Sequence, residues 1–278
     1  MPIAHPLQQR LATAGVLTPV VILAVLFLPT AYFSILMGAV VCLGAFEWSG
    51  LIGLQLDASR WAYTALVAIG LGLLWFAAVP VWDLYVLAVA GAWWVATALA
   101  LTRIRDVVPK SGFDAWLIPV GLVVLVPPWV AIVRLHRLDH DGPWLVLALM
   151  MLIWIADSVA YFSGRRWGRR KLAPVISPGK TRAGVYGALI GAALWGSILV
   201  LLLKLSPVSG AFLVLLCVLA ALLSVVGDLF ESLLKRRRGL KDAGSILPGH
   251  GGVLDRIDSM TAAAPLFALG LIWLEKSL

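Results

Sequence analysis

Charged residues are scarce in this chain of 278 residues, and cysteines are scarcer still. Only 13% of the residues are Asp, Glu, Lys or Arg, whereas 62% are hydrophobic, and the mean hydropathy is +0.98. These values exclude a disordered chain and lie far above those of a soluble domain. Cys42 and Cys217 both lie in apolar stretches, so we expect buried thiols rather than a disulfide framework. The lack of a Cys/His cluster argues against a zinc site.

Long uncharged stretches dominate the chain instead. Several run for about 17–20 residues, which is long enough for a helix to cross a bilayer. We therefore predict an all-α fold, a polytopic integral membrane protein with about nine transmembrane helices and two basic cytoplasmic loops. Because the apolar segments continue along the chain, the first is not expected to be a cleavable signal peptide. The predicted spans are residues 14–29, 31–52, 61–79, 82–101, 115–133, 144–163, 184–203, 209–230 and 258–274.

The basic residues are distributed unevenly between the two sides of this predicted bundle. Cytoplasmic loops are enriched in Lys and Arg, which sets the orientation of a membrane protein. With a cytoplasmic N-terminus, all of the 22 Lys and Arg residues lie on the cytoplasmic side except Arg134, Arg137, Lys204 and Lys276. The C-terminus then lies on the far side. The net charge of +8 does not indicate nucleic-acid binding, since no soluble domain carries a basic patch.

The two halves of the chain differ in polarity. Residues 1–150 are mainly apolar helices with short connections, for which we predict a scaffold or a dimer surface. Residues 151–278 hold two long polar segments, loop A (residues 164–182) and loop B (residues 231–257), and form the predicted catalytic region.

Three acidic residues lie near the ends of loop B. Asp228 falls near the end of the eighth predicted span, while Asp255 and Asp258 open the ninth. Residues at i and i+3 share a helix face, so the last two carboxylates can point to one spot. Mg²⁺ favours a few carboxylates combined with substrate phosphate oxygens. The alternative is that these acids only pair with Arg256 or with the basic run 235–238.

The basic residues of loop B have two interpretations as well. The run 235–238 can be a topology signal that is attracted to anionic lipid, and its first lysine can form an i,i+4 ion pair with Glu231. Lys241 leads into the turn-rich segment 248–252, whose glycines allow a ligand to approach the backbone closely. Such a segment before a helix N-terminus is a plausible phosphate cradle. His250 is either a donor to phosphate or an ordinary loop residue.

Loop A ends in Ser-Pro-Gly-Lys-Thr before the seventh predicted span. This is not a P-loop, because position 174 is proline where that motif needs glycine, and no strand precedes it. Lys180 and Thr181 nevertheless lie at a helix start, where backbone N–H groups and the helix dipole attract anions. Further positive charge comes from Arg165, Arg166, Arg169, Arg170 and Lys171.

Two carboxylates fall within or near the end of predicted spans. Asp157 lies in the sixth span, where an ionisable residue marks a functional site by default, although it can also anchor a basic residue of loop A. Glu47 lies near the end of the second span, as an interfacial carboxylate or as the partner of a basic residue elsewhere.

The segment SLLKRRRGLKDAGSILPGHGGVLDRID, residues 232–258, closely resembles the hallmark motif of the phosphatidate cytidylyltransferases, also called CDP-diacylglycerol synthases. Asp228 with Glu231 and Ser232 resembles the acidic segment before that motif. The family usually has a second lysine where Gly179 stands and a glutamate where Ala183 stands. A second set of residues resembles the upstream motif of the same family. These residues are Asp157, Ala160-Tyr161, Gly164-Arg165, Gly168, Lys171-Leu172, Pro174, Ser177-Pro178 and Lys180-Thr181.

This resemblance implies a nucleotidyltransferase of phospholipid biosynthesis in the bacterial inner membrane. It would join CTP to phosphatidate, release pyrophosphate, require Mg²⁺ with a second monovalent cation such as K⁺, and form homodimers. If the family's residue roles apply at the matching positions, Asp228, Asp255 and Asp258 are the metal ligands and, together with Lys241, the catalytic residues. The substrate-binding residues would be Ser177, Lys180, Thr181, Arg165, Lys171, Arg236, His250 and Arg256.

Two other functions are compatible with a polar site in an apolar bundle. A CTP-dependent polyprenol or phytol kinase would share the site chemistry but transfer the γ-phosphate. A transporter would bury Asp157 and Glu47 among its helices, but it has no need of two basic loops on one face. The chain also lacks the repeat symmetry that many transporters show.

Overall fold

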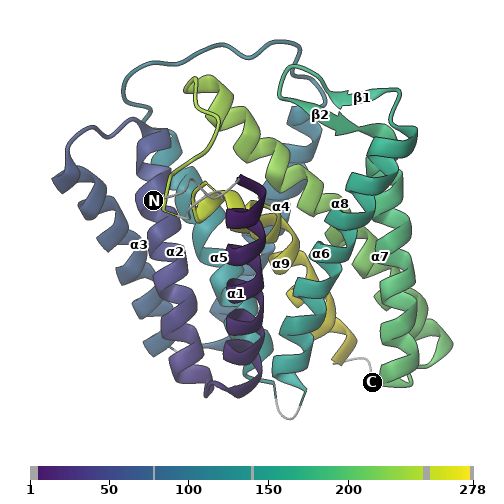
Figure 1. Ribbon diagram of the computed structural model, residues 1–278. Coiled ribbons are helices and arrows are strands. Elements are labelled where there is room, and N and C mark those ends of the chain that lie inside the picture. The colour runs from purple at the N-terminus through teal and green to yellow at the C-terminus, as the bar shows by residue number, and fades with distance from the viewer. Residues whose placement is uncertain (1–5, 78, 139–140, 247–250, 276–278) are drawn as a thin grey trace.

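The computed structural model describes residues 6–77, 79–138, 141–246 and 251–275 (Figure 1). In this part of the chain there are nine α-helices and one antiparallel β-hairpin. The helices are α1 (Pro6–Phe27), α2 (Thr30–Ile52), α3 (Asp57–Ala77), α4 (Pro80–Leu101), α5 (Leu117–His136), α6 (Gly142–Trp167), α7 (Arg182–Leu203), α8 (Pro207–Arg237) and α9 (Leu254–Glu275). The hairpin consists of β1 (Lys171–Ala173) and β2 (Ser177–Thr181).

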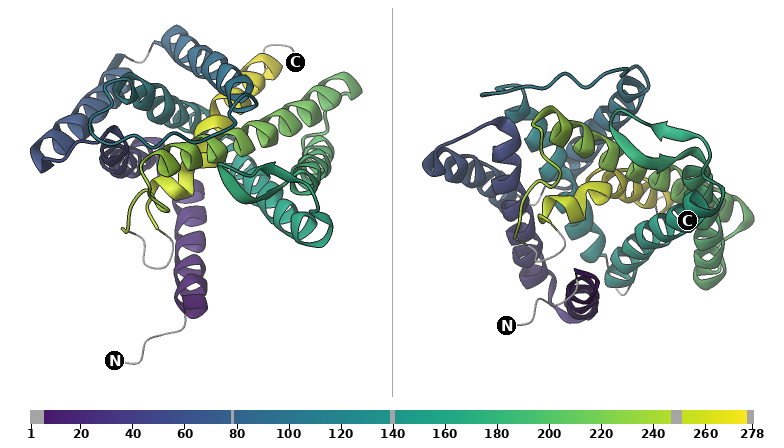
Figure 2. Two further views of the ribbon diagram at one scale, coloured as in Figure 1. Left: turned by 90° about the horizontal axis from the view of Figure 1, so that it is seen from above. Right: turned by 45° about the horizontal axis from the view of Figure 1, so that its top comes forward.

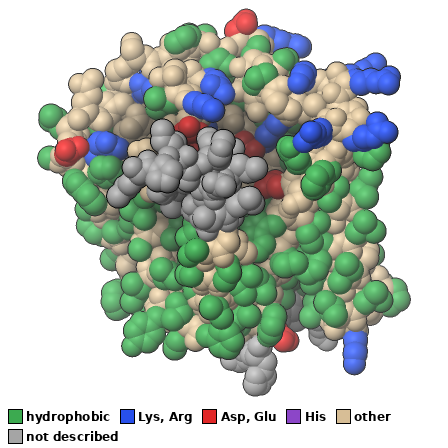
Figure 3. Space-filling view, viewed as in Figure 1, with side chains coloured by type: hydrophobic (Ala, Val, Ile, Leu, Met, Phe, Trp, Pro, Cys, Tyr) green, Lys and Arg blue, Asp and Glu red, His purple; other side chains and the backbone are tan. Residues whose placement is uncertain are grey.

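The predicted all-α membrane fold is confirmed. Eight helices of the described chain, α2 to α9, are long and apolar enough to cross a membrane, and the apolar part of α1, Gly15–Phe27, is shorter. The protein is therefore an integral membrane protein. Figure 3 shows a broad hydrophobic surface around the bundle, with Lys and Arg side chains gathered mostly above it at one end.

Several helix ends lie elsewhere than predicted, and the two that bound loop B affect the site. Helix α8 continues to Arg237, so most of the basic run 235–238 forms its last turn rather than part of a loop. Positive side chains are favoured there by the partial negative charge of the helix C-terminus. Helix α9 begins at Leu254. The non-helical part of loop B is consequently shorter than the predicted 231–257.

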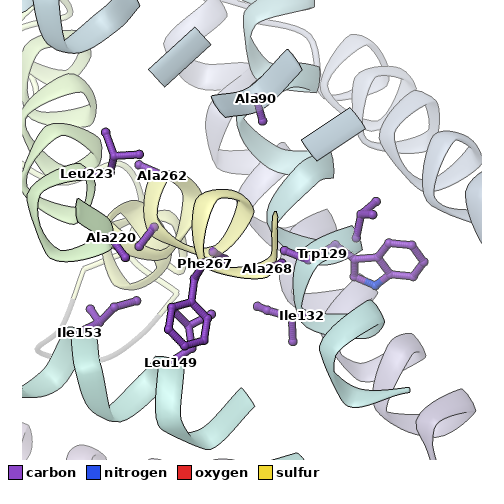
Figure 4. Close-up of a cluster of buried hydrophobic side chains, with 14 of the residues drawn as sticks. Ala90, Trp129, Ile132, Leu149, Ile153, Ala220, Leu223, Ala262, Phe267 and Ala268 are labelled. Atoms are coloured by element: carbon purple, nitrogen blue, oxygen red, sulfur yellow. The ribbon is translucent and has the colours of Figure 1, made fainter. Parts of the chain in front are cut away.

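Helix α9 lies at the centre of the bundle. It packs against α8, α5, α4, α6 and α2, and thus joins the two halves of the chain in one core (Figure 2). Its buried face is rich in alanine, including Ala262 and Ala268, which lets neighbouring helices approach closely. Figure 4 shows Phe267 of α9 beside Leu149 of α6, with Ala220 of α8 on one side and Ile132 of α5 on the other.

Both polar segments lie at the same end of the bundle. The β-hairpin, the end of α8 and the start of α9 are all found there, together with the connection between α4 and α5 (Figure 1). Arg134, Arg137 and Lys204, three of the basic residues predicted for the other side, lie at the opposite helix ends. The structure thus separates the charges as the positive-inside pattern predicts.

Arg238 fastens the end of α8 to the N-terminal half of the chain. Its guanidinium donates to the carbonyl oxygens of Leu51 (2.7 Å) and Ile52 (2.8 Å), the last residues of α2. It also donates to the carbonyl oxygens of Lys110 (2.9 Å) and Gly112. A helix C-terminus leaves its last carbonyls without intrahelical donors, so one arginine satisfies α2 and the α4–α5 connection together.

Arg238→Ala should therefore lower the free energy of unfolding by about 2–4 kcal/mol, since several hydrogen bonds from one charged group are lost. The melting temperature of the purified protein in detergent measures this. Arg105→Ala, which removes an exposed arginine of the α4–α5 connection, is the matched control and should change little. Equal melting temperatures for the two variants would contradict the anchoring role.

Candidate functional site

A cavity of about 480 Å³ opens at the polar end of the bundle. It lies between α6, the hairpin, α7, α8 and the first turns of α9, all in the predicted catalytic region. Its wall combines charged side chains with glycines and apolar groups. The lining residues are Asp157, Ala160, Tyr161, Gly164, Arg165, Gly168, Lys171, Leu172, Gly179, Lys180, Thr181, Gly184, Val185, Val225, Asp228 and Ser259.

Thr181 joins the hairpin to α7, as the prediction of a helix start at this residue requires. Its side-chain oxygen accepts the backbone N–H of Gly184 at 3.1 Å, which is the standard role of a threonine N-cap. Gly164 and Gly168 let this corner approach α6: a Cβ at Gly168 would collide with the carbonyl of Gly164 and lie 2.8 Å from the Thr181 hydroxyl. The Thr181 side chain is buried, and its hydrogen bond in the structure is to the backbone of α7.

Lys180 and Asp228 meet across the cavity. The Lys180 Nζ lies 2.5 Å from Oδ2 of Asp228, so the hairpin is tied to α8 by an ion pair. The hydroxyl of Ser232, one turn further along α8, donates to Oδ1 of Asp228 at 3.2 Å. A predicted phosphate-binding cation and a predicted metal ligand are thus direct partners in the structure.

Asp228 also lies within electrostatic reach of two other carboxylates, Asp157 of α6 and Asp258 of α9. The close approach of α8 to α9 at Gly227 causes the second proximity, because a Cβ there would collide with the carbonyl oxygen of Asp258. The place of Asp157 in the sixth predicted span suggested that it would be enclosed in the apolar core. Instead its side chain is exposed and lines the cavity. Like charges so close together favour a bound cation.

Asp255 has a different environment from the other two predicted metal ligands. Its Oδ1 lies 2.5 Å from the Lys235 Nζ, and its Oδ2 accepts the backbone N–H groups of Ala243 (2.9 Å) and Gly252 (2.8 Å). Lys235 also pairs with Glu231 at 3.0 Å, so the predicted i,i+4 pair is present. Both oxygens of Asp255 are therefore used to hold loop B.

The structure does not bring the three predicted ligands into one cluster. Within the described ranges, no group of three or more His, Cys, Asp or Glu side chains is arranged to hold a metal ion. Asp228 and Asp258 still fit Mg²⁺, which is often held by one or two carboxylates, with substrate phosphates and water as its other ligands. Asp255 fits that role less well, because its oxygens already accept three N–H donors.

The predicted substrate-binding residues fall into two groups. Arg165, Lys171, Lys180 and Thr181 line the cavity, and Arg165 donates to the Tyr161 hydroxyl at 3.1 Å. Arg256 is not among the lining residues but interacts electrostatically with Asp157, which is. The remaining described residues, Ser177, Arg236 and Lys241, are not part of the cavity wall. His250 lies outside the described residues.

Glu47 has a role that neither sequence-based interpretation covered. Among the described residues its carboxylate forms no ion pair with a basic side chain, but it accepts the backbone N–H groups of Val253 and Leu254 at the start of α9. The signal in the sequence was a carboxylate inside an apolar span, but the identity of its partner could not be inferred from that signal.

Comparison with known proteins agrees with these motifs. The model of a family described as "Cytidylyltransferase family" matches residues 8–273. The chain belongs to this family. The match covers both halves, although the motifs that suggested the family lie between residues 157 and 258.

Relatives within the family are similar over nearly the whole chain. A phosphatidate cytidylyltransferase of Pseudomonas aeruginosa is 44% identical over 269 residues, which cover 96% of this chain and 97% of the relative. One from Haemophilus influenzae is 36% identical over 94% of this chain and 97% of its own length. One from Bacillus subtilis is 32% identical, with 93% and 95% covered.

Proposed function

We propose that this protein transfers the cytidylyl group of CTP to phosphatidate, forming CDP-diacylglycerol and pyrophosphate. The observation that carries the proposal is the cavity at the polar end of a membrane bundle, which is lined by the ion pair of Lys180 and Asp228, with Asp258 within electrostatic reach of both. Both substrates are polyanions and one is a lipid, so the site needs cations and access from the membrane. The names of the three relatives support the same reaction.

In this reaction a phosphate oxygen of phosphatidate attacks the α-phosphorus of CTP. A new P–O bond forms to the lipid phosphate, the bond between the α-phosphorus and its bridging oxygen breaks, and pyrophosphate leaves with that electron pair. The nucleophile is already anionic at neutral pH, so the protein needs no activated Ser or Cys. Catalysis then depends on positioning and on neutralising charge.

The cations of the cavity supply that neutralisation. Arg165, Lys171 and Lys180 line its wall and would bind phosphate oxygens, and Arg256, which interacts electrostatically with Asp157, would add positive charge. Lys180 would exchange Asp228 for a substrate phosphate, which releases the Asp228 carboxylate. Asp228 and Asp258 would hold the magnesium ion, which when bound supplies further neutralisation of the triphosphate.

We further propose that the two polar segments face the cytoplasm of a bacterial inner membrane, which gives the site access to CTP. The grouping of Lys and Arg at their end supports this. Ser245 is exposed in loop B and Val208 is exposed at the opposite end. In a background without Cys42 and Cys217, Ser245→Cys should react with an impermeant maleimide only from the cytoplasmic side, and Val208→Cys only from the other. The reverse pattern would reject the orientation.

We also propose that the protein is a homodimer, on the basis of the family resemblance alone. Light scattering of the protein in detergent tests this, because the mass shows whether two chains associate.

The fate of the CTP phosphates separates this function from a CTP-dependent lipid kinase. CTP labelled at the α-phosphorus should label the lipid product, whereas CTP labelled at the γ-phosphorus should release labelled pyrophosphate. Purified protein, phosphatidate and Mg²⁺ suffice for the measurement. Lipid labelled only from the γ-position would reject cytidylyl transfer in favour of the kinase.

The carboxylates should differ in the way their loss affects turnover. Asp228→Asn and Asp258→Asn should each lower kcat by at least about 100-fold, with a higher Mg²⁺ concentration for half-maximal activity and little change in melting temperature. Asp255→Asn should lower activity and melting temperature together, because Lys235 and loop B lose their acceptor. Asp57→Asn, at an exposed position of α3, is the control. Wild-type turnover in Asp258→Asn would reject the metal assignment.

A further inference from the structure

Glu47 is a buried carboxylate of the N-terminal half that contacts the catalytic region directly. Its side chain is only 2% exposed. Its Oε1 accepts the backbone N–H of Val253 at 3.1 Å, and its Oε2 accepts that of Leu254 at 2.7 Å. The first N–H groups of a helix have no intrahelical acceptor, and the helix dipole favours a negative charge beside them. Glu47 thus caps α9 from another helix.

The chain around Glu47 is shaped to admit this carboxylate. A Cβ at Gly244 would collide with Oε1, and one at Gly252 would lie 2.5 Å from Oε2 and 2.6 Å from Oε1. One turn earlier on α2, a Cβ at Gly44 would lie 3.4 Å from the Ile257 side chain. Two glycines of loop B and one of α2 therefore let α2, loop B and the first turn of α9 come together.

Two carboxylates divide the N–H groups at the start of α9. Asp255 accepts the N–H of Gly252, while Glu47 accepts the next two, from Val253 and Leu254. Asp258 follows in the same turn, where it lies within electrostatic reach of Asp228. The position of Asp258 relative to Asp228 therefore depends on how firmly the preceding residues are held.

We propose that Glu47 is a positioning residue for the cytidylyl transfer: by capping α9 it fixes the first turn that carries Asp255 and Asp258. The inference rests on the proposed function for its link to catalysis, but not for the capping itself. Under this proposal, residues 1–150, for which the sequence predicted a scaffold or dimer surface, help to determine the geometry of the active site. Glu47 itself is not among the residues that line the cavity; it acts through the backbone of Val253 and Leu254.

Glu47→Gln tests this with little change in shape. The amide keeps one acceptor but turns an NH₂ group towards a backbone N–H, so one capping bond is lost. We expect kcat to fall about 10- to 100-fold, the usual effect of losing a group that orients metal ligands, and the Mg²⁺ concentration for half-maximal activity to rise. In hydrogen–deuterium exchange, the amides of residues 252–254 should lose protection while the middle of α9 keeps it.

Asp83→Asn is the matched control. Asp83 is also a carboxylate of the N-terminal half, but it pairs with Arg134 at 2.9 Å at the opposite end of the bundle. Its loss should lower the melting temperature without changing the Mg²⁺ requirement or the exchange of residues 252–254. Unchanged kcat, Mg²⁺ requirement and exchange in Glu47→Gln would overturn the proposal, as would the same changes in Asp83→Asn.

A double-mutant cycle tests the geometry independently. Gly244→Ala should displace the Glu47 carboxylate and expose the amides of residues 252–254 to exchange. In a Glu47→Ala background the same change should add little, because the space is vacant. Additive effects would overturn the proposal. If the wild-type protein transfers no cytidylyl group, the proposed function fails, and the exchange measurements alone decide whether Glu47 holds α9.

Discussion

The polar end of the bundle depends on two ion pairs of one buried lysine: the Lys235 ammonium pairs with both Glu231 and Asp255. Glu231 is 3% exposed and Lys235 is 9% exposed, so neither charge is solvated by water. An unpaired charge in such a place costs several kcal/mol, which means that the three groups must assemble together. The N–H groups of Ala243 and Gly252 give Asp255 two further hydrogen-bond donors from loop B. The fold of loop B follows from that requirement.

The other contacts at this end extend the same principle to the N-terminal half. Arg238 satisfies the last carbonyls of α2, and Glu47 satisfies the first N–H groups of α9. The last turns of α2 thereby hold both the helix that leads into loop B and the helix that leaves it. The contribution of residues 1–150 to this end is therefore specific, because they supply the acceptors for Arg238 and for the N–H groups at the start of α9.

Patterns along the chain predicted the spans well, because a bilayer demands long apolar helices whatever their neighbours are. They also predicted the ion pair of Glu231 and Lys235, because residues four apart on a helix are neighbours whatever the tertiary fold. The division of labour among the acids could not be predicted in this way. Spacing shows that Asp255 and Asp258 can share a face, but the capture of Asp255 by Lys235, twenty residues earlier, is a tertiary contact. Only the packing of α8 on α9 places Asp258 beside Asp228.

The hairpin of loop A was missed for a different reason. A strand with the sequence Ser-Pro-Gly-Lys-Thr contradicts β-propensity, since Pro and Gly are disfavoured in strands. It forms as a short two-stranded ribbon whose end, Thr181, is fixed by capping α7. The departure at Gly179 is compatible with this ribbon, because a side chain there would meet open space.

The cavity wall also explains why this arrangement suits a lipid phosphate. Val185, Val225 and Leu172 line the cavity beside Lys180 and Asp228, so apolar and charged groups bound one space. A phosphate can then lie among the cations while the adjoining glycerol contacts apolar side chains. Because the proposed nucleophile needs no activation, catalysis is reduced to the placement of charge. That placement is what the ion pairs of α8 and the cap on α9 maintain inside an apolar bundle.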